Sequence, residues 1–217
     1  MFARITWSKL ANPQAQTEAA RKRFQERILP SMQAQDGFLG AVLLANSATG
    51  EGASVTYWQT AEAMAASETI ATAGRAEAAQ GGVEIQEIDR FEMVLQDRAA
   101  PPQVGSVVRV NDITAAKGQI DATIALMRDT AIPAIRKLNG YRALLIFLNR
   151  ESGRLLVASA WNTAADREAS ESVTGGLRRQ AADLAQSQAG VRVTLYETIL
   201  SEVSPAAQQA ASAAAKA

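Results

Sequence analysis

Arg109 and Asn111 stand two residues apart on an expected β-strand, a spacing that puts both side chains on one face of it. An arginine and an amide so placed could hold an enolate or a carboxylate by charge-assisted hydrogen bonds. Arg4 and Thr6 have the same spacing on the strand expected at residues 2–8. The residues can bind an anion if this face points into the interior of a barrel. The alternative is that they face solvent at the strand end.

Large aromatic side chains are the other candidates for a binding site. Trp58 and Trp161 could line a pocket and stack on a planar substrate, or each could anchor the following helix to the sheet, because burial of a large aromatic ring is favourable. Tyr196 could act as a phenol donor, but no base is spaced to serve it. No motif identifies a catalytic residue. The candidate pocket-lining residues are therefore Trp58, Trp161, Arg109, Asn111, Arg4 and Tyr196.

The chain contains no histidine and no cysteine. This composition excludes serine–histidine and cysteine–histidine catalysis, histidine-ligated haem and most zinc sites. No carboxylate pair, phosphate-binding glycine loop or metal-ligand spacing is present in the sequence. We therefore expect neither a metal nor a cofactor.

Charge and hydropathy limit the partners. The 22 basic residues balance the 22 acidic ones, so neither nucleic acid nor an anionic membrane surface is expected to bind. No apolar run approaches the ~20 residues of a membrane span. We expect a cytoplasmic protein.

The sequence repeats itself at a spacing of 103 residues. The shared residues are turn formers, a proline near a helix end, a tryptophan and a short Ser-Glu pair, and these types specify backbone geometry. They are Pro30, Gly37, Asn46, Gly50, Trp58, Thr60, Ala61, Ser67 and Glu68, which recur as Pro133, Gly140, Asn149, Gly153, Trp161, Thr163, Ala164, Ser170 and Glu171. The chain is therefore predicted to hold two copies of one domain.

Hydrophobic periodicity predicts the order β-α-β-β-α-β in each copy, which is the ferredoxin-like unit. Pro30 and Pro133 should kink or break the last turn of the first helix of each copy. Asp89-Arg90 could interrupt the last strand of the first copy. We expect an α+β protein of two such units, residues 1–95 and 106–200, whose antiparallel sheets pack into an α/β barrel. Residues 96–105 should form a linker, and the alanine-rich tail at 201–217 should be frayed or disordered.

Part of the pattern resembles a known family. Gly37-Phe38-Leu39-Gly40, a strand, a glycine turn, a strand ending in Tyr57-Trp58 and then Gln59-Thr60-Ala61-Glu62-Ala63-Met64 are similar to the antibiotic biosynthesis monooxygenase (ABM) domain of the dimeric α/β-barrel superfamily. The second copy repeats the pattern around Gly140 and Trp161. The resemblance implies a barrel that is usually built by two chains. Here one chain would form it as a pseudo-dimer, and further homodimerisation stays open.

The resemblance also implies a function. The resemblance implies that the partner is a small hydrophobic or aromatic molecule bound in a pocket between sheet and helices. The activities of the family include cofactor-free oxygenation of aromatic polyketides and haem degradation. We expect a cofactor-independent monooxygenase acting on a small aromatic or polyketide-like molecule. The alternative is a non-catalytic small-molecule-binding or structural barrel protein. Family members often carry a histidine about nine residues after the strand tryptophan, and this chain has Ser67 and Ser170 there.

Haem-degrading relatives depend on a histidine to ligate iron, and this chain has none. We therefore predict that the protein does not bind haem stoichiometrically. The measurement is a titration with haem followed at the Soret band. Tight, saturable binding at one haem per chain would contradict the prediction.

Overall fold

The computed structural model describes residues 1–204, so the expected tail at 205–217 lies outside the described part. The first repeat contains β1 (Phe2–Leu10), α1 (Pro13–Arg23), a π-helical turn η1 (Phe24–Ile28), α2 (Leu29–Gln33), β2 (Phe38–Ala45), β3 (Glu51–Trp58), α3 (Ala61–Ala66), α4 (Glu68–Gln80) and β4 (Val83–Arg98). The second contains β5 (Val107–Thr114), η2 (Lys117–Gln119), α5 (Ile120–Leu126), the π-helical turn η3 (Met127–Ala131), α6 (Ile132–Ile135), β6 (Tyr141–Asn149), β7 (Arg154–Trp161), α7 (Ala164–Ala169), α8 (Glu171–Ala185) and β8 (Val191–Val203).

The strands hydrogen-bond in the order β1-β3-β2-β8-β5-β7-β6-β4, which closes into a barrel. Because the order is closed, β4 lies beside β1 just as β8 lies beside β5. Each repeat therefore has the strand order fourth, first, third, second, which is that of a ferredoxin-like unit. The predicted α+β fold of two such units is confirmed.

The long last strands β4 and β8 each contribute to both compact units of the chain. Among residues 1–204, the first unit comprises Met1–Phe91 and residues 196–204, and the second comprises Glu92–Leu195. Within the first unit, residues 197–203 of β8 pair with β2. Within the second, residues 92–98 of β4 pair with β6. The last residues of β4 and β8 thus each form a strand in the sheet of the unit that does not contain the rest of their repeat.

This strand sharing corrects three expectations from the sequence. Residues 96–98, expected to begin the linker, are the end of β4, and residues 201–203, expected to begin the tail, are the end of β8. The irregularity in β4 is a register shift between Met93 and Leu95, and not a break at Asp89-Arg90. All three expectations failed because the sequence pattern of a strand does not reveal how far its pairing continues.

Proline does not break the first helix of either repeat. Instead, the turn before it widens, and the Leu29 amide donates to the Phe24 carbonyl five residues earlier, as the Ile132 amide does to that of Met127. Proline has no amide hydrogen to donate, so a wider turn next to it keeps the helix continuous. The expected kink at Pro30 is therefore a π-helical turn.

Hairpin glycines explain part of the repeat. Gly50 and Gly153 have φ values of +77° and +73°. A Cβ on Gly50 would lie 2.3 Å from the carbonyl oxygen of Leu10, and one on Gly153 would lie 2.4 Å from that of Ala115. Both the left-handed conformation and this close backbone approach require glycine.

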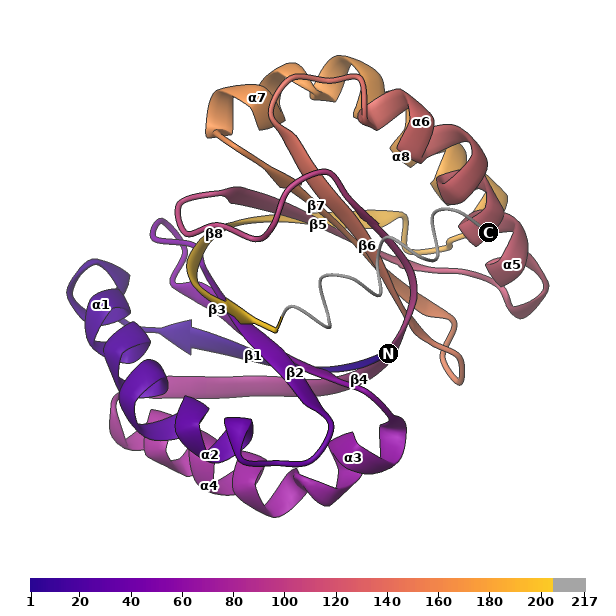
Figure 1. Ribbon diagram of the computed structural model, residues 1–217. Helices are drawn as coiled ribbons and strands as arrows, with labels where there is room; N and C mark the ends of the chain where they lie inside the picture. Colours follow the sequence, from indigo (N-terminus) through magenta and orange to yellow (C-terminus); the bar gives the residue numbers. More distant parts are fainter. Residues whose placement is uncertain (205–217) are drawn as a thin grey trace. The chain divides into compact units, whose positions relative to one another are not determined.

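In each unit the helices cover one face of the strands, and the main core lies between the two layers (Figure 1). Trp58 and Trp161 are at the centre of these cores and are fully buried, as the anchoring interpretation expects. Phe38 meets the Trp58 ring edge-on at 5.3 Å, and Tyr141 meets that of Trp161 at 5.8 Å. Each tryptophan therefore joins the end of the third strand to the helix layer.

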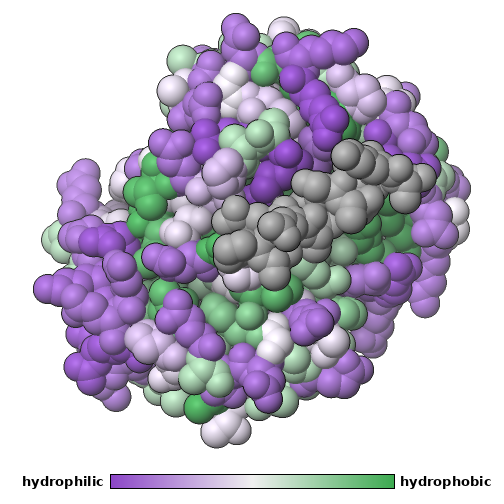
Figure 2. Space-filling view, viewed as in Figure 1, coloured by the Kyte–Doolittle hydropathy of each residue, from purple (hydrophilic) through white to green (hydrophobic). Residues whose placement is uncertain are grey.

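The surface is mainly polar. On the face that Figure 2 shows, hydrophilic side chains predominate, with smaller hydrophobic areas between them. Among residues 1–204, no helix is long and apolar enough to cross a membrane.

We predict that Trp58→Ala and Trp161→Ala each reduce the free energy of unfolding by about 3–5 kcal/mol, because each leaves a large cavity in a core. Thermal melts of the two variants measure the effect, and Trp58→Phe, which keeps an aromatic ring, should lose less. If neither alanine variant melts earlier than the wild type, the core role assigned to these residues is wrong.

Candidate functional site

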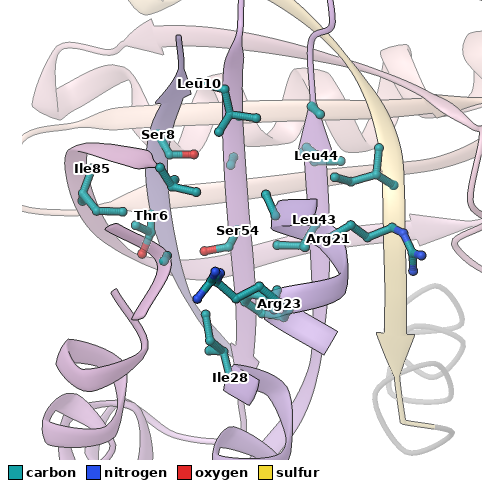
Figure 3. Close-up of a pocket in the computed structure, with 18 of the residues that line it drawn as sticks. Thr6, Ser8, Leu10, Arg21, Arg23, Ile28, Leu43, Leu44, Ser54 and Ile85 are labelled. Carbon is teal, nitrogen blue, oxygen red and sulfur yellow. The ribbon is translucent and has the colours of Figure 1, made fainter. Parts of the chain in front are cut away.

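Each repeat has a cavity between its sheet and its helices. The first-repeat cavity has a volume of about 110 Å³ and the second-repeat cavity about 50 Å³. Side chains of β1 and β3, among them Thr6, Ser8 and Ser54, line the first cavity from the sheet side, and Arg23 and Ile28 line it from the helix side (Figure 3). The larger cavity is the better candidate for a ligand site.

Arg4 lies at the buried end of the first cavity. Its side chain extends from β1 toward the break between α3 and α4, and only 2% of it is exposed. One terminal nitrogen, Nη2, donates to the Met64 carbonyl and to Ser67 Oγ, the latter at 3.0 Å. The guanidinium carbon lies 5.7 Å from the centre of the Trp58 ring, within the range of a cation–π contact.

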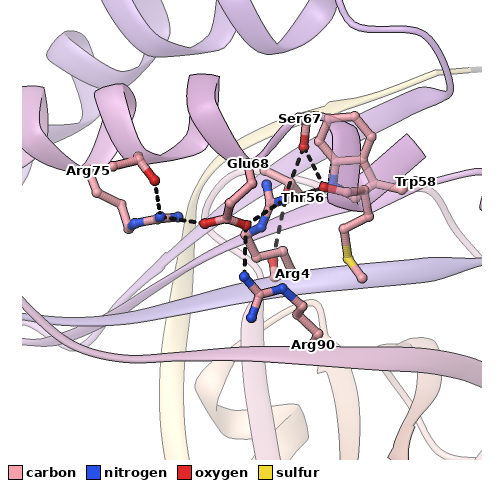
Figure 4. A network of polar contacts seen from close by, with 9 residues as sticks. Arg4, Thr56, Trp58, Ser67, Glu68, Arg75 and Arg90 are labelled. Atoms are coloured by element: carbon pink, nitrogen blue, oxygen red, sulfur yellow. Dashed lines mark hydrogen bonds and ion pairs between the residues drawn. The ribbon is translucent and has the colours of Figure 1, made fainter. Parts of the chain in front are cut away.

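A single carboxylate, that of Glu68, is shared by three arginines (Figure 4). Its oxygens lie 3.1 Å from Arg4 Nη2, 2.6 Å from Arg75 Nη2 and 2.8 Å from Arg90 Nη2. Burial alone would raise the pKa of Glu68, but hydrogen bonds from Arg75 and Arg90 and the charge of Arg4 outweigh it and lower the pKa to about 2. Glu68 is therefore ionised at neutral pH, and the cluster keeps an excess of positive charge.

Several donors of this cluster lack a partner. Nε and Nη1 of Arg4 and Nη1 of Arg75 are buried and form no hydrogen bond with the described residues. Burial lowers the pKa of Arg4, only partly offset by the charge of Glu68, and the positive charges of Arg90 and Arg75 lower it further. An unpaired buried donor is costly, and a cation in such surroundings attracts an anion. Both arginines line the first cavity, so the arrangement favours an anionic ligand there.

The second repeat reproduces this arrangement around Arg109. Its guanidinium donates to Glu171 at 2.7 Å and to Ser170 Oγ at 3.4 Å, and lies 6.0 Å from the centre of the Trp161 ring. Burial lowers the pKa of Arg109 to about 10, partly opposed by the charge of Glu171. Arg178 binds the same carboxylate. The two repeats therefore hold one polar cluster in common.

The structure separates the residues that the sequence grouped as candidates. Arg4 lines the first cavity, and Arg109 and Asn111 line the second. Trp58 and Trp161 lie in the cores, where each indole nitrogen donates to a neighbouring hydroxyl of its own strand. Tyr196 is buried on β8, where its ring lies 6.4 Å from that of Trp7.

The sequence left open whether the strand face that carries Arg4 and Arg109 points into the barrel or to solvent, and neither alternative holds. Arg4 and Arg109 are each 2% exposed, so they do not face solvent. They reach residues of the helix layer, so their face of the strands is the one that the helices cover. A strand pattern gives two faces and does not say which of them the helices will cover.

Sequence reasoning missed Ser67 and Glu68 as partners of Arg4. Their recurrence as Ser170 and Glu171 was the available signal, since both pairs stand where the second helix is interrupted. Arg75 and its equivalent Arg178 carried the same signal. No group of three or more acidic side chains that could hold a metal occurs within residues 1–204.

Comparison with solved structures identifies the fold. An anthrone oxidase-like protein superposes with a TM-score of 0.66 at 11% identity, covering 94% of this chain and 93% of its own. LmHde, a heme-degrading enzyme from Listeria monocytogenes, gives a TM-score of 0.55 at 10% identity, covering 91% and 99%. At such low identities these likenesses support the fold alone.

Comparison of sequences identifies relatives and a family. The uncharacterized protein Rv2557 of Mycobacterium tuberculosis strain H37Rv is 25% identical over 162 residues, which are 73% of this chain and 72% of that protein. Residues 9–77 match the family model of antibiotic biosynthesis monooxygenase. This range contains most of the first repeat, including Trp58, Ser67 and Glu68. Residues 9–77 are thus similar to the antibiotic biosynthesis monooxygenase domain, the family that the sequence pattern resembles.

Proposed function

We propose that the protein is a cofactor-independent monooxygenase whose substrate, a small aromatic molecule, binds in the first-repeat cavity as an enolate or phenolate. The observation that carries this proposal is the buried Arg4 guanidinium, which lines the cavity with two nitrogens that have no hydrogen-bond partner among residues 1–204. The match of residues 9–77 to the monooxygenase family supports the same function.

The positive cluster would do the chemistry that an anionic substrate needs. Arg4 and Arg75 lie where they can stabilise the negative charge of an ionised substrate, because three arginines share the one Glu68 carboxylate. The low dielectric of a buried site strengthens this attraction. Stabilising the anion lowers the cost of losing the substrate's proton to solvent.

The substrate itself would supply the electrons. A methylene carbon activated by an aromatic ring or a carbonyl loses a proton, and the resulting carbanion attacks molecular oxygen to form a carbon–oxygen bond. Loss of water from the peroxide then leaves a carbonyl group. The reaction consumes one CH₂ group and one O₂ and yields one C=O group and one H₂O. This scheme uses no imidazole and no thiolate, in agreement with the composition.

The direct test is oxygen consumption by the purified chain with anthrone, in a chelator-treated solution without added metal or flavin. We expect oxygen uptake and anthraquinone formation in equal amounts, both above the rate of anthrone alone. A rate no higher than that of anthrone alone would favour the alternative, a non-catalytic binding protein.

We predict that Arg4→Met lowers kcat by about 10²–10³-fold, the usual loss when one donor to a developing anion is removed. Arg27→Met is the matched control, because Arg27 is a mostly exposed arginine of the same unit that contacts Glu77. The control should keep the wild-type kcat, and equal melting temperatures would separate catalysis from folding. An Arg4→Met variant with unchanged kcat would remove Arg4 from the mechanism.

A further inference from the structure

We propose that the two repeats have divided their roles, so that the chain binds one ligand in the first-repeat cavity while larger side chains reduce the equivalent cavity of the second repeat to about 50 Å³, too small for the same ligand. The inference rests on the proposed function only in taking the first cavity as the ligand site. It concerns which residues make the first cavity larger than the second.

The sheet floor of the first cavity is polar. In the pairing of β1 with β3, Thr6 lies opposite Ser54, Ser8 opposite Gly52, and Thr56 beside them opposite Arg4. Directly opposed residues of antiparallel strands share a face, so these side chains form a hydroxyl row: Thr6, Ser8, Ser54 and Thr56. Figure 3 shows Thr6, Ser8 and Ser54 on neighbouring strands at this cavity.

The equivalent floor of the second repeat is largely apolar. In the pairing of β5 with β7, Asn111 lies opposite Val157, and Ile113 lies opposite Leu155. Ile113 and Val157 thus occupy the positions of Ser8 and Ser54. Both belong to the packed core of the second repeat, where each is buried. Two small hydroxyl side chains have been replaced by two branched apolar ones.

The helix side differs in the same direction. Thr17 of α1 lines the first cavity and is half-buried. Its equivalent 103 residues later, Ile120 of α5, is buried in the second core. The longer Ile120 side chain therefore fills space from the helix side, as Ile113 does from the sheet side. These exchanges account for the smaller second cavity.

Another exchange between the repeats moves a large side chain from one helix to the other. Gly74 and Ile28 line the first cavity, and their equivalents Leu177 and Ala131 line the second. A Cβ on Gly74 would lie 2.9 Å from Ile28 Cγ2, so the large side chain simply stands on opposite helices in the two repeats. The two pairs differ by only one side-chain carbon, so we assign the larger part of the difference in cavity size to the positions of Ser8, Ser54 and Thr17.

The hydroxyl row also supplies unused hydrogen-bonding capacity. The hydroxyl groups of Thr6, Ser8 and Ser54 form no hydrogen bond with another side chain or the backbone within residues 1–204. Hydroxyl groups that line a cavity can donate to or accept from a ligand or water there, whereas the branched apolar residues of the second repeat offer no such group. Small polar residues at these positions suit a ligand site better than a core.

The test is isothermal titration of the full chain with 1-hydroxy-2-naphthoate, an aromatic anion. We expect one site per chain. The double variant Ser8→Ile with Ser54→Val gives the first repeat the side chains of the second, and it should weaken binding at least tenfold. Thr17→Ile alone is the milder version and should weaken binding in the same direction, which keeps the test decisive if the double variant does not fold.

Ile113→Val with Val157→Ala is the matched control at the equivalent positions of the second repeat. It should leave affinity and stoichiometry unchanged. The inference would be overturned by any one of four results. These are two sites per chain, absence of saturable binding, unchanged affinity in the folded first-repeat variants, and an equal loss of affinity in the control. Oxygen uptake is measured separately. One binding site per chain without oxygen uptake refutes only the monooxygenase function. Two binding sites per chain with oxygen uptake refute only the division of roles.

Discussion

The burial of Arg4 is the interaction on which the arrangement of the first repeat depends. A guanidinium removed from water loses several kcal/mol of hydration unless hydrogen bonds and opposite charge replace it. Here the Met64 carbonyl, Ser67 and Glu68 replace it from the helix side, and the face of Trp58 covers it. The strand, the tryptophan and the break between α3 and α4 are thereby held in one geometry, which leaves part of the guanidinium directed to the cavity.

A buried guanidinium in the second repeat also needs partners that replace its hydration, and this explains which residues the second repeat shares with the first. Arg109, Trp161, Ser170 and Glu171 reproduce the buried cluster. These contacts support the junction of sheet and helices, so both repeats need them for folding. The floor beyond the arginine is free of that constraint. It is polar in the first repeat and apolar in the second, where Ile113 contributes to the core.

Charge balance distinguishes this cluster from an ordinary structural ion pair. A pair of opposite charges with filled hydrogen bonds has no affinity left for a ligand. Three arginines around Glu68 retain positive charge, and two nitrogens of Arg4 remain unused. The low pKa of Glu68 means that this balance stays the same throughout the neutral range. The cluster can therefore stabilise the fold and still attract an anion.

The sequence alone indicated the duplication and the order of strands and helices, because turn glycines, prolines and hydrophobic periods are local signals. It left open whether Trp58 and Trp161 line a pocket or anchor the helices. It could not determine that β4 and β8 extend into a second sheet pairing, because pairing depends on distant strands. It placed Arg4 and Arg109 on one strand face but not beneath the helices. The partners of Arg4 are Ser67 and Glu68, and those of Arg109 are Ser170 and Glu171, each more than sixty residues away in the chain. Only tertiary packing brought the arginines and their partners together, since the helix layer decides which face of the sheet is covered.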